Sequence, residues 1–140
     1  MRFTLKALAL LAAVSVLGAC SIQRHVQSVD TDDKIKHVCI QNAPATKMSA
    51  YQPMLQRLIQ NRGITTEIYN GAKPDHCEYH LTYVANWSWD GAMYLRYNNI
   101  DVYRNNRNIG KVEYKAGLMS LAKWGKTESK VAPLVAQLFP

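Results

Sequence analysis

Residues 77–89 read CEYHLTYVANWSW, and this stretch decides the fold. Every second position carries an apolar or aromatic residue or a cysteine, while the positions between them are mostly polar. Successive side chains of a strand point to opposite faces, so this alternation predicts one long strand with one buried face. The stripe expected to be buried comprises Cys77, Tyr79, Leu81, Tyr83, Ala85, Trp87 and Trp89.

Shorter stretches on both sides of it also have strand character. Residues 35–41 (IKHVCIQ) and 64–69 (ITTEIY) are rich in β-branched side chains, and the turn signal Asp90-Gly91 leads into a further strand over residues 93–103. Residues 109–116 alternate apolar and charged positions, which suits an edge strand or a sheet with one open face.

Two stretches have the periodicity of amphipathic helices. The first begins at a capping-box pattern over residues 49–52, ends at Gly63, and has its apolar face at Tyr51, Met54, Leu55, Leu58 and Ile59. The second closes the chain with Val131, Leu134, Val135 and Leu138, and Pro133 leaves its start open. The order β-α-β-β-β-β-α predicts an α+β or α/β two-layer sandwich, with a mixed sheet of about five strands and both helices on one face.

The first twenty residues have the pattern of a targeting segment. Arg2 and Lys6 precede an apolar run over residues 7–17, which is too short for a stable membrane span. The sequence Leu17-Gly18-Ala19-Cys20 resembles the lipobox of bacterial lipoproteins, in which the signal is cut before the cysteine. That resemblance implies a signal peptide over residues 1–19 and diacylglycerol and N-acyl chains, such as palmitate, on Cys20.

A polar, aperiodic stretch follows the predicted lipid site. We expect residues 20–34 to be the lipidated cysteine and a flexible tether, and residues 35–140 to be a single periplasmic domain. Ser21, rather than aspartate, follows the cysteine, so we expect sorting to the outer membrane with the domain facing the periplasm. Removal of Arg2 and Lys6 lowers the net charge from +7 to +5, and anionic lipid headgroups or acidic envelope proteins suit that charge better than nucleic acid.

The remaining two cysteines form an even pair in a compartment that is oxidising. Cys39 and Cys77 are therefore predicted to form a disulfide, which would place the first strand beside the long one; two buried free thiols are the alternative.

Several segments together resemble a family of small proteobacterial lipoproteins, the Sbal-type family. They are residues 38–40 (VCI), residues 77–90 with the AMYL of residues 92–95, KWGKTE of residues 123–128, and PLVAQLF of residues 133–139. The resemblance covers nearly all of the predicted domain. It implies a lipoprotein with the cysteine pair, and it implies no catalytic residues.

Few side chains offer candidate chemistry. His76 and His80 would lie ~13 Å apart on a strand, too far to share a metal ion. His37 or Cys77 would have to complete a site, and a disulfide would consume the Cys77 thiol, so no metal site and no cofactor are predicted. Trp87, Trp89 and Asp90 could form a platform for a ligand or partner, although the two tryptophans also continue the buried stripe.

The motifs G-x-S-x-G, H-E-x-x-H, G-x-G-x-x-G and the P-loop are absent from the sequence, and no enzymatic activity is predicted. We expect a membrane-anchored envelope accessory that binds a protein partner, and a periplasmic binder of a small ligand or an inhibitor is the alternative. An exposed apolar patch would favour the first, and a deep pocket lined by tryptophans the second.

Overall fold

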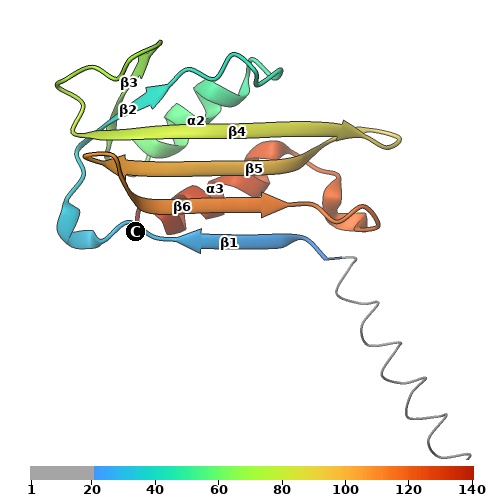
Figure 1. Cartoon of the computed structure of the whole chain (residues 1–140). Helices are drawn as coiled ribbons and strands as arrows, with labels where there is room; N and C mark the ends of the chain where they lie inside the picture. Colours follow the sequence, from blue (N-terminus) through green and yellow to red (C-terminus); the bar gives the residue numbers. More distant parts are fainter. Residues whose placement is uncertain (1–20) are drawn as a thin grey trace, which may run out of the picture.

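The computed structural model describes residues 21–140, and the signal peptide and Cys20 lie outside them. Six strands form one mixed sheet in the order β1-β6-β5-β4-β2-β3 (Figure 1). Strand β2 runs parallel to β3 and β4, and the other neighbours pair antiparallel. The strands are β1 (Gln23–Gln27), β2 (His37–Gln41), β3 (Thr65–Tyr69), β4 (Tyr79–Trp89), β5 (Met93–Arg104) and β6 (Arg107–Lys115).

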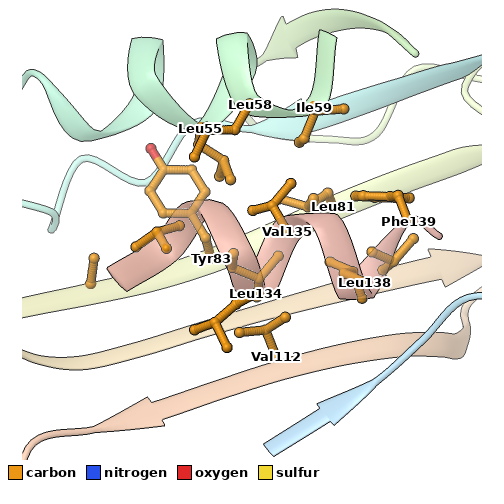
Figure 2. Packing of buried hydrophobic residues seen from close by; sticks show 14 of the residues in the cluster. Leu55, Leu58, Ile59, Leu81, Tyr83, Val112, Leu134, Val135, Leu138 and Phe139 are labelled. Carbon is orange, nitrogen blue, oxygen red and sulfur yellow. The ribbon is translucent and has the colours of Figure 1, made fainter. Parts of the chain in front are cut away.

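Two helices, α2 (Tyr51–Gln60) and α3 (Thr127–Leu138), lie side by side on one face of the sheet, as predicted. Short 3-10 helices, η2 (Thr31–Asp33) and η3 (Leu121–Lys123), stand in the loops. The core lies between the two layers, where Leu55 of α2 and Leu134 of α3 pack over Leu81 of β4 (Figure 2). Each of these three leucines is at most 1% exposed.

The long strand confirms the alternation over most of its length. Tyr79, Leu81, Tyr83 and Ala85 are buried beneath the helices. The prediction is wrong at the end of the stripe, where Trp89 is 70% exposed and Trp87 is half-buried. The β4–β5 ladder changes register at Asn86/Trp87, and the hairpin continues beyond α3, so no helix covers its tip.

The predicted flexible tether over residues 20–34 is wrong for its described part. Residues 23–27 form β1, which pairs antiparallel with β6 at an edge of the sheet, and η2 follows. The domain therefore begins at Gln23 rather than at residue 35, and the sheet has six strands rather than about five. Strand β6 keeps one open face, as its charges indicate, but it is covered at its edge by β1.

The helix ends also differ from the sequence pattern. The capping box at residues 49–52 does not form, because the N-cap of α2 is Ala50 rather than Ser49 and no side chain accepts a capping hydrogen bond there. Helix α3 begins at Thr127, so Pro133 lies inside it rather than at its start. None of the helices within residues 21–140 is long and apolar enough to cross a membrane.

Candidate functional site

The disulfide between Cys39 and Cys77 is present, as predicted. Its Cα atoms are 5.9 Å apart, and it ties β2 to the residues just before β4. Both cysteines are almost fully buried and pack with Tyr69 on the sheet face opposite the helices. The first predicted strand therefore does lie beside the long one, as a bridge between these residues requires.

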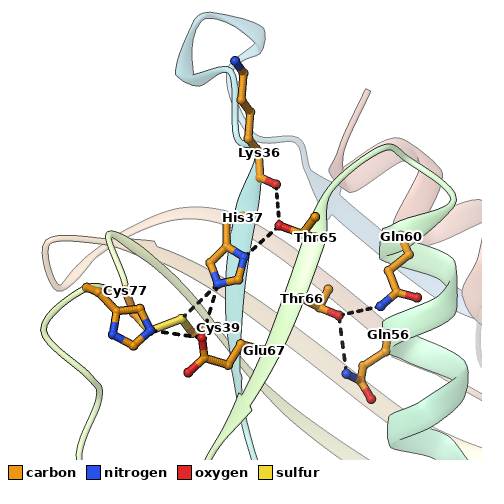
Figure 3. A network of polar contacts seen from close by, with 10 residues as sticks. Lys36, His37, Cys39, Gln56, Gln60, Thr65, Thr66, Glu67 and Cys77 are labelled. Carbon is orange, nitrogen blue, oxygen red and sulfur yellow. Dashed lines mark hydrogen bonds and ion pairs between the residues drawn. A yellow bond between two sulfur atoms is a disulfide. The ribbon is translucent and has the colours of Figure 1, made fainter.

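Three polar side chains gather over this disulfide, and we call them the histidine–glutamate cluster: His37, Glu67 and His76 (Figure 3). Glu67 Oε2 lies 3.0 Å from His76 Nε2 and 3.7 Å from His37 Nε2. His37 Nε2 is also 3.7 Å from the Cys39 sulfur. The three side chains are about half exposed, so solvent and small ions reach them.

Sheet register and the disulfide together build this cluster. Parallel pairing sets Cys39 opposite Glu67 and places His37 opposite Thr65, so His37 and Glu67 lie on neighbouring strands. His76 arrives from the loop between β3 and β4, where the adjacent Cys77 is bonded to Cys39. The hydrogen bond from His76 is the main reason that the pKa of Glu67 is lowered.

The structure does not bring His80 into this cluster. Its ring stacks on Tyr103 at 5.0 Å between centroids, and its Nδ1 is buried without a hydrogen bond. Burial, with a smaller contribution from Lys73, lowers the pKa of His80. The prediction that both histidines lie on one strand is wrong, because His76 is in the loop before β4 and only His80 is on the strand. Glu67 is the partner of His76 that spacing in the sequence did not indicate.

A second feature is an exposed group of large apolar side chains at one end of the domain. We call it the apolar end and define it as Trp89, Met93, Leu118, Met119, Leu121 and Trp124. Leu121 is 84% and Met119 75% exposed. These residues come from the β4–β5 hairpin and from the loop that follows β6, and β1 starts at the same end (Figure 1).

A buried lysine joins the two parts of the apolar end. The Lys123 ammonium contacts the Asp90 carboxylate and donates to the backbone oxygen of Leu118. It also lies over the rings of Tyr94 and Trp124, and the indole N–H of Trp124 donates to the backbone oxygen of Asp90 at 2.9 Å. The hairpin and the loop are therefore held as one surface.

This lysine contact predicts an asymmetric response to substitution. Lys123 is 5% exposed in its side chain whereas Asp90 is 59% exposed. Asp90→Ala leaves the buried ammonium without its carboxylate, and we expect it to lower the free energy of unfolding by about 2 kcal/mol. Lys123→Met leaves Asp90 in water, and we expect a change within about 1 kcal/mol. Urea denaturation of both variants measures the difference, and a larger loss for Lys123→Met would contradict this account.

The predicted platform of Trp87, Trp89 and Asp90 is only partly assembled. The indole N–H of Trp87 donates to Thr127 Oγ1 at 3.1 Å, and its ring meets Tyr51 edge-on in the core. The Asp90 carboxylate accepts a hydrogen bond from the Lys123 ammonium, and this contact joins the β4–β5 hairpin to the loop that follows β6. Trp89 extends outward as part of the apolar end.

One motif was missed in the sequence. Ser120 and Lys123 have the S-x-x-K spacing of some acyl-transfer enzymes. Here the spacing falls across η3, and the Lys123 ammonium faces Asp90 and two aromatic rings. The sequence did not predict the apolar end either. Alternation along a strand shows which side chains share a face, but it does not show whether that face is buried or exposed.

The comparisons with known proteins give a fold and no family. No family model matches the chain, and no curated protein matches it, so the resemblance to Sbal-type lipoproteins stays a prediction. Two structures of the PelC dodecamer from Paraburkholderia phytofirmans cover 84% of this chain, with TM-scores of 0.57 and 0.54. They are 11% and 10% identical to it and are themselves covered over 94% and 95% of their length.

A PDZ domain protein from Parabacteroides distasonis is similar at a TM-score of only 0.46 over 37% of its length, too weak a likeness to carry an argument. At the identities found, the likeness to PelC is one of fold, and the chain is an α+β domain of that architecture.

Proposed function

We propose that this protein is a lipid-anchored accessory of the bacterial cell envelope whose folded domain lies directly against the membrane through its apolar end. The observation that carries the proposal is the position of Ser21. It lines a cavity of about 460 Å³ together with Leu118, Met119 and Lys115. Acyl chains on Cys20 would therefore enter the bilayer beside the apolar end.

The chemistry of that end suits a membrane surface. Tryptophan and aliphatic side chains partition into the interfacial region, and an acyl chain adds ~0.8 kcal/mol for each buried CH₂. Arg96, Lys115 and Lys126 are exposed nearby and can pair with anionic headgroups. Only Ser21 and Ile22 separate Cys20 from β1, so the anchor has no long tether and the domain stays at the surface.

The first test concerns the anchor. Cys20→Ser is expected to abolish acylation and to release the protein from membranes or leave its signal uncleaved. Mass spectrometry and membrane fractionation measure both, and Ser21 predicts that the native protein fractionates with the outer membrane. Unchanged mass and unchanged membrane retention in the variant would overturn the proposal.

The second test concerns the apolar end without the lipid. In a protein produced from Ser21 onward, which carries neither the signal nor acyl chains, the domain is expected to float weakly with vesicles of anionic phospholipid. Substituting Trp89, Leu118 and Leu121 together by serine should abolish that flotation, because three highly exposed apolar groups are lost. Val84→Ser is the matched control, since Val84 is 47% exposed on the opposite, open face of the sheet. Equal flotation of the triple variant and the control would contradict the membrane contact.

A protein partner would then meet the surfaces that the membrane leaves uncovered. PelC, which has a similar fold, assembles as a dodecamer, and this makes a second copy of the chain the first partner to test. Chemical cross-linking in intact envelopes, with light scattering of the purified protein, measures self-association.

The alternative function, binding of a small ligand in a pocket lined by tryptophans, has less support. A cavity of about 700 Å³ is lined by Arg104 and Asp33 among others, and no tryptophan lines it.

A further inference from the structure

The histidine–glutamate cluster has the donor atoms and the arrangement of a metal site. We propose that His37, Glu67 and His76 bind a late first-row divalent metal ion, Zn²⁺ or Cu²⁺, over the Cys39–Cys77 disulfide. This site lies on β2, β3 and the following loop, and it does not depend on how the protein is anchored. Two imidazoles with one carboxylate form a donor set that suits these ions.

The distances between donor atoms are close to those that a bound ion imposes. Bonds of 2.0–2.1 Å place two donors of one ion about 2.9 Å apart at a right angle and about 3.3 Å apart in a tetrahedron. The carboxylate oxygen Glu67 Oε2 lies 3.0 Å from His76 Nε2 and 3.7 Å from His37 Nε2. The ligand atoms of Glu67 and His76 lie within 4.8 Å of each other and of both disulfide sulfurs, whereas His37 Nε2 has to approach Glu67 to share an ion with them.

The hydrogen bond at Nδ1 of His37 turns its other ring nitrogen, Nε2, toward that position. The Thr65 hydroxyl donates to the backbone oxygen of Lys36 at 3.0 Å, so it accepts from the His37 Nδ1–H at 2.8 Å (Figure 3). The other ring nitrogen, Nε2, then faces the Glu67 carboxylate and the Cys39 sulfur, both 3.7 Å away. A metal ion would replace a proton at Nε2, and an outer hydrogen bond of this kind orients metal-binding histidines.

The disulfide lies beneath the proposed ligands and fixes the position of His76, which precedes Cys77 in the chain. Both sulfur atoms are bonded to each other and buried, so they are not thiolate ligands in this state. Their bond fixes Cys77 on β2, and it thereby holds His76 over Glu67. Spacing in the sequence did not predict this site because its members come from two strands and a loop.

The test is calorimetric titration of the untagged full-length protein, in detergent and with its disulfide intact, with Zn²⁺ alone and then Cu²⁺ alone. We expect one ion per chain, and at least about a tenfold loss of affinity for His76→Ala and for Glu67→Gln. His25→Ala is the matched control, because His25 is an exposed histidine on β1 at the other edge of the sheet. It should leave the affinity unchanged.

A spectroscopic measurement separates ligation from folding. The electron paramagnetic resonance spectrum of the Cu²⁺ form is expected to show coupling to two imidazole nitrogens, and His76→Ala should reduce this to one while circular dichroism stays unchanged. Thr65→Val, which removes the partner of His37 Nδ1 and the hydroxyl hydrogen bond to Lys36 but no metal ligand, should weaken binding about tenfold or more and keep both nitrogens. Failure of either ion to bind, or equal affinity in His76→Ala and His25→Ala, would overturn the proposal.

Discussion

Replacing both Cys39 and Cys77 by alanine is expected to lower the free energy of unfolding by about 4 kcal/mol. The bridge closes a separation of 38 residues, and without it the unfolded chain regains the entropy of that loop. A domain of this size has a modest core, so such a loss is a large part of its stability. Guanidinium denaturation of the wild type with and without reductant, beside the double variant, measures it.

The double variant avoids a complication of the single ones. Cys39→Ala alone would leave a thiol on Cys77 that can form mixed dimers, so non-reducing electrophoresis should accompany each measurement. Membrane attachment is expected to be the same in the wild type and the double variant, because the bridge and Cys20 are separate. A denaturation midpoint that does not move on reduction would show that the bridge contributes no stability.

The second large effect is expected in the core. Leu134→Ala should lower the free energy of unfolding by about 2–5 kcal/mol, because Leu134 is 1% exposed and packs between α3 and the sheet. Leu121→Ala is the same chemical change at a residue that is 84% exposed, and we expect less than about 0.5 kcal/mol there. Thermal unfolding followed by circular dichroism compares the two.

This pair also separates stability from surface function. Leu121→Ala should weaken vesicle flotation of the non-acylated protein, whereas Leu134→Ala should leave flotation unchanged at temperatures where it is folded. If Leu121→Ala destabilised the fold as much as Leu134→Ala, the assignment of Leu121 to an exposed surface would be wrong.

Burial explains which strands could be predicted from the sequence. Residues 79–85 alternate between buried and more exposed side chains because helices cover one face of β4. The residue types alternate between apolar and mostly polar in the same way, so the sequence predicts this strand. Strand β1 has the sequence QRHVQ and four of its five residues are exposed. It forms because its backbone groups pair with those of β6. Backbone hydrogen bonds do not require apolar side chains, so the polar sequence of β1 does not predict a strand.

The candidate sites divide in the same way. The pairing of Cys39 with Cys77 follows from the cysteine count together with the predicted oxidising compartment. The meeting of His37 with Glu67 depends on the parallel register of β2 and β3, which two short β-branched segments do not specify. Trp89 continues the alternation of its strand, so the sequence pattern predicts that it is buried. It is exposed because α3, which begins at Thr127, does not extend over the tip of the hairpin.

Residues from early and late in the described part of the chain meet at one edge of the sheet, and this affects the order in which the domain can fold. Gln23 pairs with Lys115, and the backbone N–H of Val29 donates to the oxygen of Leu138 at 2.9 Å. Strand β1 precedes β6 in the chain, so its backbone groups stay unpaired until residues 107–115 have been made. Contacts of such long range are slow to form. Late completion of this edge of the sheet is the consequence of placing β1 beside β6.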